Sequence, residues 1–179
     1  MACDLTSGRN KACFDVTGGV KSVSFCNFGE LGAITYDVTD TDVITTFGGT
    51  PVFFQYQLKG SANTYTETIT KDVNNGTSFF AQSLAIQLPK MDKATHKELK
   101  LLVWNSPHVV VEDFNGNNFV MGLTNGADVT GGTIVTGGAR GDLNGYTLTL
   151  TAEEALPANF LDSDIVAAGG SISATNITP

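Results

Sequence analysis

The sequence lacks the features that mark membrane and exported proteins. No stretch approaches the roughly 20 apolar residues of a membrane-spanning helix, and the opening "MACDLTSGRNKACFDVTGG" contains no hydrophobic segment of the kind found in signal peptides. We therefore expect a protein that is made and kept in a cytoplasm, without a membrane partner.

Cysteine is also scarce. The three cysteines, Cys3, Cys13 and Cys26, lie in the first 26 residues, and their separations match neither a paired C-x-x-C metal site nor a framework of disulfide bridges. Thiols of cytoplasmic proteins are kept reduced. The sequence thus predicts three free thiols and no bound metal.

Basic residues are few and unevenly placed. The chain has 10 Lys and Arg residues against 18 Asp and Glu residues, a formal net charge of -8. Four of the ten lie in one short stretch, as Lys90, Lys93, Lys97 and Lys100. Because phosphate binding depends on clustered Lys and Arg, the acidic remainder argues against a DNA-binding module.

Arrangements typical of catalytic and metal sites are missing as well. Neither His96 nor His108 has a nucleophile or ligand partner at a suitable spacing. The acidic segment 37–42 lacks the glycine and glutamate of a calcium loop. The segment 137–141, "GGARG", precedes a strand and lacks the Lys-Ser or Lys-Thr pair of a phosphate-binding loop. These patterns predict no enzyme and no cofactor.

What the sequence does contain is a rhythm of turn signals about every 10 residues, which is typical of an all-β sandwich or barrel. The predicted strands cover about 21–28, 34–37, 43–47, 51–60, a long hairpin at 62–88 that turns at Asn75-Gly76, and a hairpin at 108–123. Residues 125–144 read as a glycine-rich loop, and 167–179 as a short strand or a frayed tail. We expect a single domain over 1–179, with 1–17 and 166–179 as candidate extended arms.

The pattern becomes helical once, over about 90–104, where apolar residues recur near helical spacing among strong helix formers. Asn105-Ser106-Pro107 ends this helix, since a residue before proline leaves the helical region. The predicted fold is therefore mainly β, an antiparallel sandwich or barrel with one flanking α-helix.

The segment 146–151 alternates strictly between two kinds of side chain. Tyr146, Leu148 and Leu150 form an apolar face that we expect to pack on the core, and Thr147, Thr149 and Thr151 form the opposite face. A threonine face suits a surface that is neither deeply buried nor strongly charged.

The order of four segments resembles tail-tube-like structural proteins of tailed bacteriophages, over about residues 18–160. The segments are "GGVKSVSFCNF", "NGTSFFAQSLAIQLPKMDKATHKELKLLV", "VVVEDFNGNNFVMGLTNGADVTGG" and "GDLNGYTLTLTAEEALPA". The resemblance implies subunits that close into a six-membered ring, with inner strands lining a channel for DNA, and rings that stack through loops and a long hairpin. The tube of the type VI secretion system shares this architecture.

The resemblance also implies a location in the virion tail, after assembly in the host cytoplasm. The implied partners are further copies of the chain, other virion proteins (a tail terminator, a baseplate or connector, and a sheath in a contractile tail) and DNA in passive contact. The short N-terminus with its cysteines departs from the family pattern, which leaves an N-terminal contact between rings open.

Candidate interaction residues follow from this implied assembly. The contacts between rings or subunits are assigned to the hairpin tip, Lys71, Asp72, Val73, Asn74, Asn75, Gly76 and Thr77, and to the glycine-rich loop with Arg140. Thr147, Thr149 and Thr151 face either the channel or a neighbouring subunit, or are an ordinary solvated face. Lys90, Lys93, Lys97 and Lys100 form either a solvated helix face or an outer surface that meets an acidic sheath or connector.

Two other functions fit the same fold. One is a ring or adaptor protein at the head–tail junction. The other is a decoration or receptor-binding β-sandwich, which is disfavoured because Trp104 is the only tryptophan available for stacking on sugars.

Overall fold

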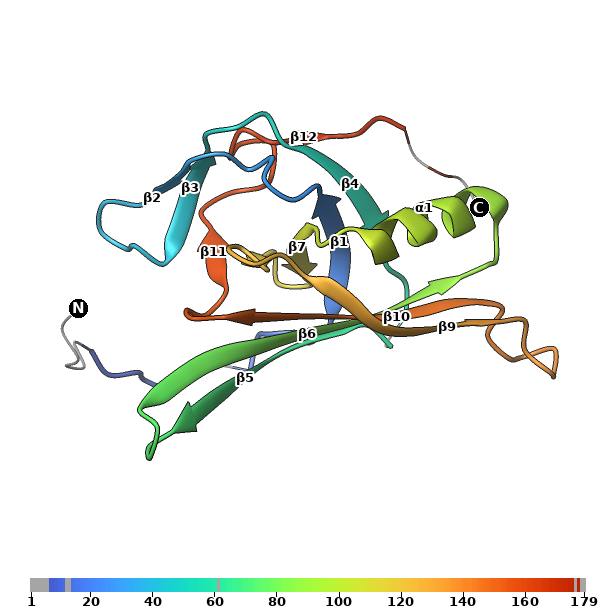
Figure 1. The fold of residues 1–179 in the computed structure, drawn as a ribbon, viewed down its shortest axis with the longest axis horizontal. Coiled ribbons are helices and arrows are strands. Elements are labelled where there is room, and N and C mark those ends of the chain that lie inside the picture. The colour runs from blue at the N-terminus through green and yellow to red at the C-terminus, as the bar shows by residue number, and fades with distance from the viewer. Residues whose placement is uncertain (1–6, 12–13, 61, 176, 178–179) are drawn as a thin grey trace.

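The computed structural model describes residues 7–11, 14–60, 62–175 and 177. Cys3, Cys13 and parts of both candidate arms lie outside these residues. The described chain forms two β-sheets and one helix (Figure 1). The elements are β1 (Val20–Cys26), β2 (Ile34–Tyr36), β3 (Val43–Phe47), β4 (Val52–Gln57), β5 (Thr64–Asp72), β6 (Thr77–Pro89), α1 (Lys93–Trp104), β7 (His108–Asp113), β8 (Asn118–Met121), β9 (Asp128–Val135), β10 (Gly145–Glu154), β11 (Asn159–Leu161) and β12 (Ser171–Ile172).

The larger sheet has eight strands in the order β12-β4-β1-β7-β8-β11-β3-β2, and the smaller sheet has four in the order β5-β6-β10-β9. The described strands do not close into a barrel, so the sandwich-like arrangement is the one observed. Most pairs of the described strands are antiparallel, as expected, and the exceptions are β11, which runs parallel to β3, and β12, which runs parallel to β4. Both pairs join strands that are distant in sequence, and connections that cross over a sheet permit parallel pairing.

Apolar side chains form two cores, one on each face of the larger sheet. The first fills the space between the two sheets and α1, and includes Val109, Val111, Tyr146 and Leu150. The second lies on the other face and includes Val110. The middle strands β1 and β7 are therefore largely buried on both faces, which explains the continuous apolar run 109–111 in β7.

The long hairpin at 62–88 is confirmed. Strands β5 and β6 pair from Thr64 with Ala85 to Asp72 with Thr77, and the turn contains Gly76 at a φ of 67°. A positive φ favours glycine, as the Asn75-Gly76 signal predicts. Figure 1 shows this hairpin projecting at one end of the molecule, while the loop between β9 and β10 lies at the other end.

The prediction of one glycine-rich loop over 125–144 is wrong for residues 128–135, which form the edge strand β9. Glycine usually weakens a strand, but here it permits close pairing. A side-chain carbon on Gly132 would lie 2.5 Å from the carbonyl oxygen of Thr147 on β10. The two glycines at 131 and 132 therefore belong to the sheet, and the true loop is confined to about 136–144.

The helix begins later than its sequence pattern indicates. The Asp92 carboxylate accepts hydrogen bonds from the backbone N–H groups of Ala94 (2.9 Å) and Thr95 (3.1 Å), which caps the first turn. Lys90 precedes the helix and has a φ of 68°. No helical segment in the described part of the chain has the length and apolar character that crossing a bilayer requires.

Candidate functional site

The outward face of the four-stranded sheet is composed almost wholly of small, neutral side chains. Its alternating residues are Thr64, Thr66, Thr68 and Thr70 on β5, Phe79, Ala81, Ser83, Ala85 and Gln87 on β6, Thr147, Thr149 and Thr151 on β10, and Gly131 and Thr133 on β9, with the ring of Phe79 as a large apolar exception near the hairpin tip. We call this surface the threonine face. The four β5 threonines are exposed, and the three on β10 are half-buried between neighbouring strands.

The predicted alternation in β10 is confirmed. Tyr146 and Leu150 are fully buried and Leu148 is nearly so, whereas the threonines between them point to the other side of the sheet. On that side the Thr133 and Thr147 hydroxyl oxygens lie 2.7 Å apart and share a hydrogen bond. Thr147, Thr149 and Thr151 thus belong to one continuous surface with β5, β6 and β9.

Charge is nearly missing from this face. Within strands β5, β6, β9 and β10, all of which the structure describes, Lys71 is the only basic residue, and it alternates onto the opposite side of β5. Acidic side chains lie toward one end of the threonine face, as Asp72, Asp128 and Glu153. The surface offers hydroxyl groups and a few negative charges.

Beneath the threonine face, Gln82 is a buried polar residue on the otherwise apolar side of β6. Its amide oxygen accepts from the Gly122 backbone N–H at 3.0 Å, and its Nε2 donates to Glu67 Oε1 at 3.3 Å. The same Glu67 oxygen accepts from the Ala158 backbone N–H at 3.0 Å. Gln82 therefore links the two sheets through hydrogen bonds rather than through apolar packing.

Replacing Gln82 by Met should lower the free energy of unfolding by about 2 kcal/mol, because it leaves the buried Gly122 N–H without an acceptor although the volume is kept. Urea denaturation measures this change. Leu84→Met on the same strand is the matched control, and it should cost less than about 1.5 kcal/mol. Equal losses for the two variants would contradict this role.

The hairpin tip is held in shape by its own hydrogen bonds. The Asp72 carboxylate accepts from the backbone N–H groups of Asn74 (2.8 Å) and Asn75 (3.2 Å) and from Asn75 Nδ2 (2.6 Å). The backbone donors of Asn75 and Asn74 lower the pKa of Asp72. Val73 at the tip is 82% exposed. The tip is thus ordered by local hydrogen bonds, and a single exposed apolar side chain such as Val73 is common on protein surfaces.

Arg140 lies in a second ordered loop. The Asp142 carboxylate accepts from the backbone N–H groups of Ala139 (2.7 Å) and Gly138 (2.9 Å), and these donors lower the pKa of Asp142. The pairing of Gly145 with Pro89 places this loop at the opposite end of the sheet from Thr77. The hairpin tip and Arg140 are therefore not brought together within one chain.

Three of the four clustered lysines, Lys93, Lys97 and Lys100, are exposed side chains of α1. The Lys100 ammonium lies 4.6 Å from the centre of the Trp104 ring, and Trp104 is 72% exposed. Lys90 precedes the helix, where its N–H donates to the carbonyl of Asn144. The cluster thus spans the start of α1 and its outer face.

The two histidines occupy different environments. Gly29 donates its backbone N–H to His108 Nε2 at 3.0 Å, so His108 Nδ1 carries the proton and donates to the Gly122 carbonyl at 2.8 Å. Both ring nitrogens of this buried side chain are occupied. His96 is exposed on α1. Over the described residues, no group of three His, Cys, Asp or Glu side chains is placed to hold a metal ion.

The described cysteine is also buried. Desolvation and the nearby Glu30 carboxylate raise the pKa of Cys26 to about 12, which keeps its thiol protonated and unreactive at neutral pH.

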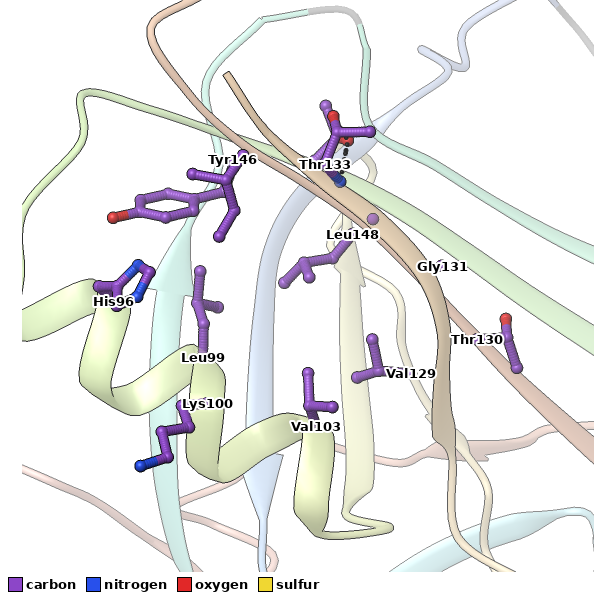
Figure 2. A pocket seen from close by; sticks show the side chains of 13 residues that line it. His96, Leu99, Lys100, Val103, Val129, Thr130, Gly131, Thr133, Tyr146 and Leu148 are labelled. Atoms are coloured by element: carbon purple, nitrogen blue, oxygen red, sulfur yellow. Dashed lines mark hydrogen bonds between the residues drawn. The ribbon is translucent and has the colours of Figure 1, made fainter. Parts of the chain in front are cut away.

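One feature escaped the sequence patterns entirely: an apolar groove between α1 and β9 (Figure 2). It depends on pairing β9 with β10 and on packing α1 against them, which the glycine-rich sequence concealed. Simple alternation could not have revealed the strand, because Val129 and Ile134 are five positions apart and reach the same inner face only through an irregularity in the β9–β10 register. Comparisons of the chain with protein-family models, with curated proteins and with solved structures found no match.

Proposed function

We propose that this chain is a structural subunit of a bacteriophage tail tube. Copies join edge to edge into a ring, and their threonine faces line an axial channel that conducts DNA. The single observation that carries this proposal is the threonine face, a whole sheet surface without a basic side chain. Other virion proteins, such as a terminator, a connector or baseplate, and a sheath, are the partners this role requires at the ends and around the tube.

The wall of a channel that conducts DNA should bind DNA only weakly. Each Lys or Arg that meets a phosphate releases counterions and adds to the affinity for DNA. Hydroxyl groups and a few carboxylates give a polyanion little to bind. The basic residues Lys93, Lys97 and Lys100 lie on α1, and the first core separates α1 from the threonine face. The distribution of charge across the subunit thus supports a channel on one side and an outer surface on the other.

The two edges of the four-stranded sheet support joining in a ring. No other described strand pairs with the outer edge of β5 or of β9. Because all three pairings within this sheet are antiparallel, β5 and β9 run in opposite directions. The β9 strand of one copy can therefore pair with β5 of the next as a further antiparallel pair. Such a head-to-tail junction repeats from copy to copy and gives a ring where the rotation between copies closes.

The stagger of these edges is suited to closure. Both edges can be compared by their positions along β6. Thr68, at the middle of β5, pairs with Ala81 on β6. Gly131, near the middle of β9, pairs with Thr149 on β10, which in turn pairs with Ala85 on β6. From Ala81 to Ala85 the stagger is four residues. A closed barrel with strands tilted by about 35–45° requires roughly four to six residues of stagger across four strands. The sheet already has an offset of this size.

The dimensions also suit a DNA duplex. Six copies, the number implied by the resemblance, would give a barrel of 24 strands. At about 4.8 Å per strand, its backbone circle would be at least ~37 Å across, and strand tilt widens it further.

Purified protein should form rings or short tubes with a central hole when examined by size-exclusion chromatography and negative-stain electron microscopy. The elution volume should fall with concentration, since the junction forms by mass action. A monomer that persists at high concentration would contradict the proposal and favour a binding module. A tagged subunit should label the virion tail along its axis.

A further inference from the structure

The groove between α1 and β9 has a volume of about 390 Å³ and is lined in part by β9, an edge strand of the smaller sheet. The α1 side contributes His96, Leu99, Lys100 and Val103, and the sheet side includes Val129, Ile134 and Leu148 (Figure 2). Val103 and Ile134 are 53% and 56% exposed. Gly131 and Gly132 contribute no side chains, so an apolar space remains beside the strand edge.

Ile69 on β5 is an apolar side chain that its own subunit leaves largely exposed to solvent. Strand alternation places it on the same side as Tyr65, which packs on the first core. Ile69 lies farther toward the hairpin tip and is 71% exposed. On this side of the sheet, one edge strand therefore has an uncovered apolar residue and the other edge borders an unfilled apolar groove.

Two registers of the β5–β9 junction have a stagger of four to six residues and keep the threonines on one face. In the first, Thr68 of the second copy lies opposite Gly131 and Glu67 lies opposite Gly132. In the second, the strand is shifted by two residues, so that Ile69 lies opposite Gly132. Ile69 pairs with Phe80 on β6, and Gly132 pairs with Leu148 on β10, which pairs with Ile86 on β6. The stagger from Phe80 to Ile86 is six residues.

The chemistry of the groove distinguishes these registers. The first sets a glutamate opposite Gly132 and therefore leaves the apolar groove without an apolar occupant. The second aims an isoleucine into the same space and covers Val103 and Leu148. Glu67 already accepts hydrogen bonds from Gln82 and Ala158 in its own chain, which keeps it from turning into the groove.

We propose that the α1–β9 groove is the docking site for Ile69 of a second copy of this chain, in the register that sets Thr68 opposite Thr133. This inference rests on the proposed edge-to-edge ring and goes further by fixing its register and its apolar anchor.

Disulfide trapping tests the register. Thr68→Cys with Thr133→Cys should form intermolecular disulfides under mild oxidation, whereas Thr66→Cys with Thr133→Cys, the matched pair for the other register, should not. A disulfide forms only when the Cα atoms lie within about 7 Å. Cys3 and Cys13 are replaced by Ser in both variants, and the buried Cys26 is kept. Non-reducing gels give the result, and electron microscopy records rings in parallel.

The outcomes separate the two proposals. Cross-linking through Thr68 and Thr133 supports the docking of Ile69, even if the products are open chains and the tube proposal fails. Rings that cross-link only through Thr66 and Thr133, or through neither pair, overturn the docking inference and leave the tube proposal standing. Absence of both rings and cross-links overturns both.

Ile69→Lys provides the independent test of the anchor. The exposed position should leave the subunit folded, while the concentration needed for ring formation should rise at least about tenfold, since one buried isoleucine per junction is lost. Val38→Lys, at a β-branched side chain that is 100% exposed in the β2–β3 turn, is the control and should leave ring formation unchanged. Equal ring formation by Ile69→Lys and unmodified protein would overturn the inference.

Discussion

Tubes assembled from the Thr149→Lys variant should retain DNA that tubes of the unmodified protein release. Thr149 lies in the interior of the threonine face, with Ala85 on one side and Gly131 on the other. These small neighbours leave space for a lysine side chain, so the substitution should be tolerated by the fold. In a ring of six copies it would place six ammonium groups around the channel.

The retention should depend steeply on salt. If one ring neutralises about six phosphates, the apparent affinity should fall about a thousandfold between 50 and 200 mM salt. Co-sedimentation of tubes with duplex DNA across this range measures it. Thr149→Gln, a neutral side chain of similar reach, is the matched control and should retain no DNA. Tubes of the lysine variant that bind no DNA at 50 mM salt would place this face away from the channel.

Shortening the long hairpin should abolish tubes without unfolding the subunit. The change replaces residues 72–77 by Asn-Gly, which supports a two-residue turn between the paired residues Lys71 and Ser78 and keeps the register of β5 and β6. The removed segment contains the exposed Val73. Strand β10 ends where Glu154 pairs with Phe80, so the removed segment projects past the end of β10. No described strand other than β5 and β6 pairs there, so the core should be unaffected.

Electron microscopy of this variant should reveal no tubes at any concentration, and far-ultraviolet circular dichroism should match that of the unmodified protein. Its thermal unfolding should remain cooperative, which separates lost stacking from a damaged fold. Normal tubes of the shortened variant would show that the tip makes no essential contact between rings.

Much of the fold follows from local patterns. Strict alternation in β10 predicted which side chains are buried, and the Asn75-Gly76 pair predicted the turn between β5 and β6. Both signals act between residues that are adjacent in sequence or paired across a short turn, so they can be identified without tertiary information.

The missed features depend on distant partners. Strand β9 was hidden because its two glycines read as a loop, and the close approach of the Thr147 carbonyl on β10 explains only Gly132. The role of Gln82 on the buried side of β6 could not be predicted, because its amide oxygen accepts a hydrogen bond from Gly122, 40 positions away. The groove beside β9 requires the helix, the edge strand and β10 to be assembled first, so no single stretch of sequence encodes it.

The presence of two cores has a consequence for the life of an unassembled subunit. Ile44, Val110, Val120 and Leu161 belong to the core on the far side of the larger sheet, away from both edges of the smaller one. This core contains ten buried residues against sixteen in the first, and its contacts are complete in a lone subunit before any polymerisation. Under the proposed function, newly made chains can remain in solution as a stable supply until a growing end takes them up.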